Sequence, residues 1–540
     1  MKKLHLLLLS LLSGVLLTLA WPADGFPGLL FIALVPMLFI EDYIHRNKER
    51  FHLFSVLFYT SPGFLVWTSL TTWWIWNASP AGGSAAVIAN ALFMAFVFNL
   101  YHVSKRYIYR PGKGFFILVF YWLSFEYVHL NWDLNWPWLN LGNGFANYVK
   151  WIQWYEFTGT FGGSLWVLMV NILVYWILSN GPSRKLTPRI YYANVIFLGL
   201  ILAVPLLYSF IRYANYVETG TPVDVVVVQP NVDPYTEQYE LPPPEVIRRN
   251  FDLAKTLIDP SVEVVVCPES ALQESIWERK LEYSESLGLV QDFTRDHPQL
   301  AVIIGASTFK EYHPGEAVPP SARKFRDNER FYDAYNTVFY IDTGKITQWS
   351  HKSRLTPGVE MMPYPKYMRF LEKYALDLGG TIGTLGTDDN RVVFTRPRDS
   401  LKMGAAICYE SVFGEFFSEF VINGANIMFV VTNDGWWGDT PGYRQHLSFS
   451  RMRAIETRRS IGRSANTGIS CFISQKGEVF QKTEYWVPAA IRQKINANDK
   501  ITFYTRYGDY IARVAVFFTF ILLLYSLAAK TIKRRRITQK

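Results

Sequence analysis

Long apolar runs constrain the fold of this chain more than any other feature. A helix that crosses a membrane needs about 20 mostly apolar residues, with roughly 17 as the lower limit. The 540-residue chain contains eight apolar runs around this length, although the second is short and contains Pro36. They lie near residues 4–20, 28–41, 53–76, 85–104, 114–130, 163–179, 190–211 and 511–529. We therefore predict eight membrane helices, seven in a transmembrane domain over residues 1–213 and the eighth over 511–529.

Basic residues in the short loops predict how these helices are oriented. Loops on the cytoplasmic side of a membrane are enriched in Lys and Arg. The basic clusters lie at 2–3, 46–50, 105–113, 184–189 and 533–536. With eight helices all the clusters fall on one side, so both termini are expected in the cytoplasm and the long insert outside. Because these clusters supply much of the net charge of +9, the charge does not indicate binding to nucleic acid.

The region between the seventh and eighth runs has the pattern of a separate α/β domain over residues 222–505. Short runs rich in Val and Ile are typical of strands that are buried on both faces. They lie at 224–229, 262–267, 301–306, 337–341, 403–408, 427–432 and 469–474. Helical patterns occur at 244–258, 283–297, 411–422 and 443–459, and hairpin signals at 342–345 and 475–478. Helices that alternate with strands predict a layered α/β fold.

Three side chains suited to acyl transfer each follow a predicted strand element. Glu269 follows the first such strand, Lys352 follows a strand pair, and Cys408 ends a third strand. Each has an ordinary explanation when taken alone: a helix cap, an exposed lysine or a core cysteine. A carboxylate, an ammonium and a thiol that follow successive strands can together form a nucleophilic site. Because the rest of the chain is so apolar, the expected acyl donor is a lipid.

Cys408 is the cysteine expected to react. Cys267 and Cys471 lie inside predicted strands and are expected to be inert. A helix is expected to start directly after Cys408, and the amino end of a helix lowers the pKa of a thiol. The backbone N–H of Tyr409 would then face a developing oxyanion.

Metal ions and organic cofactors are not expected. The chain has no Cys-x-x-Cys or His-Glu-x-x-His spacing, and its nine histidines are scattered. Its three cysteines are too few for a disulfide framework.

Short motifs around these residues are similar to those of a known family. They are Val-Gln-Pro-Asn (228–231), Cys-Pro-Glu-Ser-Ala (267–271), Ile-Cys-Tyr-Glu-Ser (407–411), Thr-Asn-Asp-Gly-Trp-Trp-Gly (432–438), Arg-Met-Arg-Ala-Ile-Glu (451–456) and Arg-Ser-Ala-Asn-Thr-Gly (463–468). The order Pro-Glu, then Lys, then Cys-Tyr-Glu resembles the nitrilase superfamily, or CN hydrolases, whose Glu-Lys-Cys triad lies in an α-β-β-α sandwich. With its flanking membrane helices, the chain resembles the bacterial apolipoprotein N-acyltransferases over nearly its full length.

The resemblance implies specific site residues. Glu269, Lys352 and Cys408 would be catalytic. Residues implied to bind substrate or to support the triad are Asn231, Glu360, Tyr409, Glu410, Ser411, Trp436 and Trp437. Glu360 keeps the family's spacing from Lys352, and with Glu410 it is expected to orient that lysine. The family's Phe-Gly pair before this glutamate is replaced by Gly-Val at 358–359.

The resemblance also implies a reaction. A phospholipid would pass an acyl chain to Cys408 as a thioester, and the acceptor would be the α-amine of a diacylglyceryl-cysteine lipoprotein, in the last step of lipoprotein maturation. The enzyme would work as a monomer in the bacterial inner membrane, with its catalytic domain in the periplasm. One alternative is a membrane-anchored nitrilase-type amidohydrolase, which uses water as the acceptor. Another is a transporter or lipid-binding scaffold with an inactive insert, which the scarcity of charges in the spans disfavours.

Overall fold

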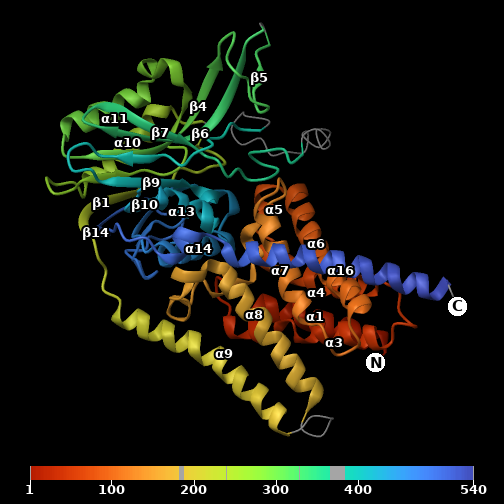
Figure 1. The fold of residues 1–540 in the computed structure, drawn as a ribbon. Coiled ribbons are helices and arrows are strands. Elements are labelled where there is room, and N and C mark those ends of the chain that lie inside the picture. Colours follow the sequence, from red (N-terminus) through yellow and green to blue (C-terminus); the bar gives the residue numbers. More distant parts are fainter. Residues whose placement is uncertain (1, 182–187, 239, 327–328, 365–383, 539–540) are drawn as a thin grey trace. The chain divides into compact units, whose positions relative to one another are not determined.

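The chain folds into two compact units. The computed structural model describes residues 2–181, 188–238, 240–326, 329–364 and 384–538 (Figure 1). One unit comprises Met1–Trp73, Gly83–Asn215 and Tyr507–Lys540, and the other comprises Trp74–Gly82 and Tyr216–Arg506. We describe each unit by itself.

The first unit is helical. Its helices are α1 (Lys3–Leu19), α2 (Leu30–Ala33), α3 (Val35–Arg46), α4 (Ser55–Thr72), α6 (Pro80–Ile108), α7 (Phe116–Leu130), α8 (Tyr155–Asn180), α9 (Pro188–Asn215) and α16 (Tyr510–Thr538). Judged by length and composition, five stretches among the described residues can cross a membrane: Pro27–Arg46, Pro80–Ile108, Tyr155–Asn180, Pro188–Asn215 and Tyr510–Ile532. The chain is therefore a membrane protein.

The structure does not confirm the predicted count of eight membrane helices. Helix α1 has 17 residues and α7 has 15, so both are shorter than a typical span. Helix α4 has 18 residues and continues through Pro62. Every predicted run does form a helix, but length and composition alone support only five spans in the part of the chain that the structure describes. The basic residues at 184 and 185 lie outside the described residues.

The second unit contains two β-sheets. Its strands are β1 (Thr221–Gln229), β2 (Val264–Val266), β3 (Leu272–Trp277), β4 (Ala301–Tyr312), β5 (Arg323–Lys324), β6 (Phe331–Asp342), β7 (Lys345–His351), β8 (Val393–Thr395), β9 (Lys402–Ile407), β10 (Ile427–Thr432), β11 (Ile461–Ala465), β12 (Cys471–Ile473), β13 (Val479–Phe480) and β14 (Ala489–Ala497). One sheet has the order β14-β1-β2-β4-β6-β5, with β3 beside β4 and β7 beside β6. The other has the order β13-β12-β11-β10-β9-β8.

The two sheets pack face to face and are covered by helices. Val225 and Val264 from the first sheet share one core cluster with Ala405 and Phe429 from the second. On the other face of the first sheet, a second core joins the strands to α10 (Pro243–Lys255) and α11 (Glu285–Asp296). Helices α13 (Gly414–Ile422) and α14 (Pro441–Thr457) accompany the second sheet (Figure 1). The short α5 (Ile75–Ala78) and α15 (Phe503–Tyr507) also belong mostly to this unit.

The α/β pattern predicted from the sequence is confirmed in this unit. All seven predicted strands, four helices and two hairpins are present, but β4 ends six residues later and β6 begins six residues earlier than predicted. The parallel order of β1, β2 and β4 buries both faces of each strand, which explains their nearly unbroken runs of Val and Ile. Strand β14, which the sequence pattern missed, pairs antiparallel with β1 at the edge of the sheet and is mostly half-exposed.

Candidate active site

Three chain segments bring Glu269, Lys352 and Cys408 together. Glu269 follows β2, Lys352 comes directly after β7, and Cys408 directly after β9. The Nζ atom of Lys352 lies 3.3 Å from Oε1 of Glu269. The thiol of Cys408 is close enough to both charges for each to change its pKa. The three residues that the sequence placed at separate strand ends therefore share one site.

Glu269 is a buried carboxylate with a hydrogen bond to each oxygen. Its Oε1 accepts from Nδ2 of Asn336 at 2.7 Å, and its Oε2 accepts from the backbone N–H of Asn433 at 2.9 Å. Only 7% of the residue is exposed. These donors fix the direction of the carboxylate, as a general base requires.

Lys352 lies between two carboxylates. Its Nζ donates to Oε1 of Glu360 at 2.7 Å, in addition to the contact with Glu269. Burial alone would lower the pKa of Lys352, but the charges of Glu269 and Glu360 and the thiol of Cys408 raise it well above its usual value. Lys352 is therefore a cation, and Glu360 lies in direct contact with it.

Cys408 has an unusual backbone conformation. Its φ is +50°, in the left-handed region that non-glycine residues rarely adopt. The residue begins a short 3₁₀ helix, Cys408–Val412, and α13 starts only at Gly414. Our expectation that a helix amino end lowers the thiol pKa is wrong: burial and the charge of Glu269 raise it, and the opposing charge of Lys352 does not compensate. The resting residue is therefore a neutral thiol, whereas Cys267 and Cys471 are fully buried in the core.

Glu410 accepts hydrogen bonds from the backbone around Lys352 and also interacts with the lysine through its charge. Its Oε1 accepts from the N–H of Ser353 at 2.6 Å, and its Oε2 accepts from the N–H of Ile407 at 2.8 Å. The carboxylate thus joins the segment after β7 to the end of β9. Burial raises the pKa of Glu410 to about 7.

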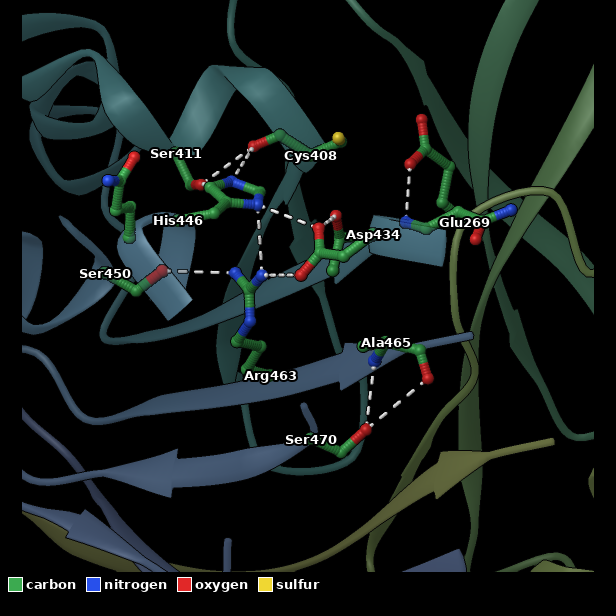
Figure 2. Close-up of polar contacts among 12 residues, drawn as sticks. Glu269, Cys408, Ser411, Asp434, His446, Ser450, Arg463, Ala465 and Ser470 are labelled. Atoms are coloured by element: carbon green, nitrogen blue, oxygen red, sulfur yellow. Dashed lines mark hydrogen bonds and ion pairs between the residues drawn. The ribbon is translucent and has the colours of Figure 1, made fainter. Parts of the chain in front are cut away.

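A buried polar network supports the carbonyl group of Cys408. This oxygen accepts from Oγ of Ser411 at 2.8 Å and lies 3.1 Å from Nε2 of His446 (Figure 2). On its other side, His446 contacts Asp434 at 2.9 Å, and Asp434 forms an ion pair with Arg463 at 2.6 Å. The network stabilises the unusual backbone conformation of Cys408, and Ser411 contributes a hydrogen bond to it.

The network also bears on metal binding. Cys408, Asp434 and His446 offer ligand atoms within 4.8 Å of one another. Both nitrogens of His446 and both oxygens of Asp434 already have protein partners, among them Ser411 and Arg463. The donor set is therefore used for hydrogen bonds and ion pairs, and we derive no metal chemistry from it.

The remaining predicted binding residues lie around the site at different depths. Trp436 lines a cavity of about 90 Å³ together with Glu269 and Glu360. Trp437 instead packs against Trp74, with ring centroids 4.7 Å apart. Tyr409 is buried beside Cys408 in the 3₁₀ helix.

Asn231 supports the wall of the site through a neighbouring segment. Its φ is +55°, and its N–H donates to the carbonyl oxygen of Asn466 at 3.0 Å. Asn466 in turn contacts Asn433 at 3.3 Å, and the N–H of Asn433 holds Glu269.

Sequence reasoning missed Asn336. Its amide lies 2.7 Å from Glu269 and 3.4 Å from Glu360, and its carbonyl oxygen accepts the backbone N–H of Lys352 at 2.7 Å. The one signal was an amide side chain directly before the predicted strand at 337–341, where a buried polar group would need a partner.

Comparisons with known proteins identify the parts of the chain. Residues 13–173 match the model of the apolipoprotein N-acyltransferase N-terminal domain, and residues 223–497 match the carbon-nitrogen hydrolase model. The apolipoprotein N-acyltransferase of Chlorobaculum tepidum is 29% identical, over 97% of this chain and 96% of its own length. The one from Geobacter metallireducens is 25% identical, over 94% and 93%. Among solved structures, a nitrilase-superfamily amidase from Nesterenkonia matches with a TM-score of 0.37 and 12% identity, over 55% of this chain and 99% of that one.

Proposed function

The chain belongs to the carbon-nitrogen hydrolase family, and we propose that it is an apolipoprotein N-acyltransferase that uses Glu269, Lys352 and Cys408. The observation that carries the proposal is that both domain models match in one chain, and that apolipoprotein N-acyltransferases align with it over nearly their full length. The contacts around Glu269 and Lys352 support the roles of these residues.

The first half-reaction acylates the enzyme. Glu269 takes the thiol proton of Cys408, and the thiolate attacks an ester carbonyl carbon of a phospholipid. Lys352 and the N–H of Tyr409 stabilise the resulting oxyanion. The intermediate then expels the lysophospholipid oxygen, which takes the proton from Glu269, and a thioester remains on Cys408.

The second half-reaction transfers the acyl chain to an amine. The acceptor is the free α-amine of a diacylglyceryl-cysteine lipoprotein. As the amine attacks the thioester, Glu269 removes one of its protons. The thiolate of Cys408 leaves and takes this proton, so the enzyme returns to its starting state. Such a sequence gives ping-pong kinetics with an isolable acyl-enzyme.

The membrane arrangement belongs to the same proposal. Eight helices cross the bacterial inner membrane, with both termini in the cytoplasm and the α/β domain over 222–505 in the periplasm. Helices α1, α4 and α7 would then be short spans beside the five longer ones, which local thinning of the bilayer accommodates. The enzyme works as a monomer, and Trp436 contacts the acyl chain of the donor from the cavity wall.

Mass spectrometry of the intact protein tests this proposal. The enzyme in phospholipid vesicles should gain the mass of one acyl chain, and a peptide map should place that mass on Cys408. A diacylglyceryl lipopeptide with a free α-amine should then remove it and become N-acylated. The matched Cys408→Ala and Cys267→Ala variants separate the nucleophile from a buried cysteine, because only the first should lose the adduct. If the lipopeptide gains no acyl chain and free fatty acid accumulates instead, the chain is a hydrolase.

A further inference from the structure

The residue before Lys352 is a histidine held between two carboxylates. Nε2 of His351 lies 2.7 Å from Oε1 of Glu278, and Nδ1 lies 2.7 Å from Oδ1 of Asp388. Only 10% of the imidazole side chain is exposed, and 8% of the Glu278 side chain. Neither the sequence motifs nor the proposed mechanism assigns a role to His351.

The geometry fixes the charge of His351. An ionised carboxylate only accepts hydrogen bonds, so each imidazole nitrogen must donate a proton to its neighbour. A ring with a proton on both nitrogens is the imidazolium cation. Burial alone would lower the pKa of His351, but the bonds to Asp388 and Glu278 raise it to about 9. We call the three residues Glu278, His351 and Asp388 the imidazolium clamp.

The clamp joins the segments on both sides of Lys352. The backbone N–H of His351 also donates to Oδ2 of Asp388 at 2.8 Å. Oγ of Ser353 donates to the carbonyl oxygen of Asp388 at 2.8 Å. The residue just before Lys352 and the residue just after it are therefore both hydrogen-bonded to Asp388.

The clamp also supports the wall of the cavity. The His351 ring stacks on Tyr335 with centroids 4.1 Å apart, and Oε1 of Glu278 accepts from Oγ1 of Thr308 at 2.8 Å. Tyr335 and Thr308 line the cavity beside Glu269. Arg391 is another cation near Asp388, and its charge contributes to keeping the pKa of that carboxyl low.

We propose that His351 is a positioning residue that must be protonated to hold Lys352 against its carboxylates. The inference rests on the proposed function, because Lys352 is assigned there to stabilise the oxyanion. When His351 loses its proton, one of its two hydrogen bonds is replaced by a contact between two acceptors. Asp388 or Glu278 then loses its hydrogen bond to the imidazole ring, and the segment that carries Lys352 is free to move.

The test follows the rate of acyl-enzyme formation from pH 6.5 to 10 in phospholipid vesicles. The wild-type rate should fall at alkaline pH near the pKa of His351. Asp388→Asn and Glu278→Gln each remove one carboxylate and should move this fall to lower pH. His351→Gln should lose about tenfold in rate at pH 7, because a charge-assisted hydrogen bond is lost. Its rate should not show the fall at alkaline pH that the wild-type rate shows. The exposed His313→Gln is the matched control and should behave like the wild type.

A second measurement separates this inference from the proposed function. Alkylation of Cys408 by iodoacetamide needs no acyl donor, and the charge of Lys352 favours the thiolate that reacts. His351→Gln should therefore slow alkylation at pH 8 several-fold while thermal unfolding shows that the protein is folded. The inference is overturned if the rate of acyl-enzyme formation falls at the same alkaline pH in Asp388→Asn and Glu278→Gln as in the wild type, and if His351→Gln is alkylated at the wild-type rate. If the wild type forms no acyl-enzyme but alkylation responds as expected, only the proposed function fails.

Discussion

Replacing Glu360 with glutamine tests how the charge of Lys352 is controlled. The carboxylate of Glu360 receives donors on both oxygens: Lys352 at 2.7 Å on Oε1 and the N–H of Thr356 at 2.9 Å on Oε2. A glutamine has one oxygen and one NH₂ group, so it can serve only one of these donors. In either orientation, its NH₂ group faces another donor. Glu360→Gln therefore loses a hydrogen bond as well as a charge, although it keeps the shape of the side chain.

The size of the effect follows from the kind of bond that is lost. A hydrogen bond to a charged group contributes about 1.5–3 kcal/mol, and each 1.36 kcal/mol changes a rate tenfold. If the lost bond acts on the oxyanion through Lys352, acyl-enzyme formation should slow about 10- to 150-fold. Lys352 keeps its contact with Glu269 at 3.3 Å, so the variant should retain some activity, unlike a variant without the nucleophile.

The assay is the initial rate of acyl-adduct formation, read by intact mass. The exposed Glu282→Gln is the matched control for the same chemical change and should react like the wild type. Thermal unfolding of each variant, measured under the conditions used for the wild type, shows whether the variant is folded. A folded Glu360→Gln enzyme within twofold of the wild-type rate would refute the argument that Glu360 holds Lys352 for catalysis.

Three further predictions concern other parts of the site. Cys408→Ser should form no thioester, and a hydroxylamine-sensitive adduct on the serine variant at the wild-type rate would contradict the assigned chemistry. Glu410 has a pKa raised from 4.5 to about 7 in the folded protein, so the folded state holds this proton more tightly than the unfolded chain does. Its contribution to stability is therefore complete below pH 4.5 and is lost as pH rises to about 7, by up to about 3 kcal/mol. Thermal unfolding should show this slope in the wild type and a weaker one in Glu410→Gln. Trp436→Ala should raise the phospholipid concentration that gives the half-maximal rate about tenfold. The substitution removes apolar surface from the cavity wall whose burial contributes roughly 1–3 kcal/mol. An unchanged concentration would mean that the tryptophan does not contact the donor.

The sequence predicted the strands of the α/β unit well because local pattern and burial agree there. The Val-rich run in β1 is buried on both faces, and a central strand of a parallel sheet is the element that buries such a run. Strand β14 was missed because its sequence, Ala-Ala-Ile-Arg-Gln-Lys-Ile-Asn-Ala, has no regular alternation of polar and apolar residues. Its identity depends on pairing with β1 over a sequence distance of more than 250 residues. The membrane helices were located because long apolar runs, like the run in β1, must be removed from water. The length of a short helix such as α7 does not by itself show that the helix crosses the membrane.

The site was only partly predictable, since charges and burial act through distances that a sequence does not contain. Motif positions indicated that Glu269 and Cys408 meet, and Glu360 was found from its spacing to Lys352. The thiol pKa was predicted in the wrong direction, because the helix amino end expected after Cys408 is a short 3₁₀ turn, and desolvation and the charge of Glu269 raise the pKa. Asn336 was missed because an amide in a strand does not reveal which carboxylates it will meet.

The charges at the site also explain why a neutral thiol suits the proposed reaction. Glu269 and Glu360 carry two negative charges and Lys352 one positive charge, so a free thiolate would add a second unmatched negative charge in a buried place. Such a charge is costly at low dielectric. If the proton of Cys408 moves to Glu269 as the thiolate forms, the net charge of the three side chains and the thiol does not change. In the proposed mechanism, the negative charge then moves on to the carbonyl oxygen of the donor, where Lys352 stabilises it. Under this proposal, desolvation and the charge of Glu269 suppress the thiolate of Cys408 until a carbonyl carbon is in place to accept its electrons.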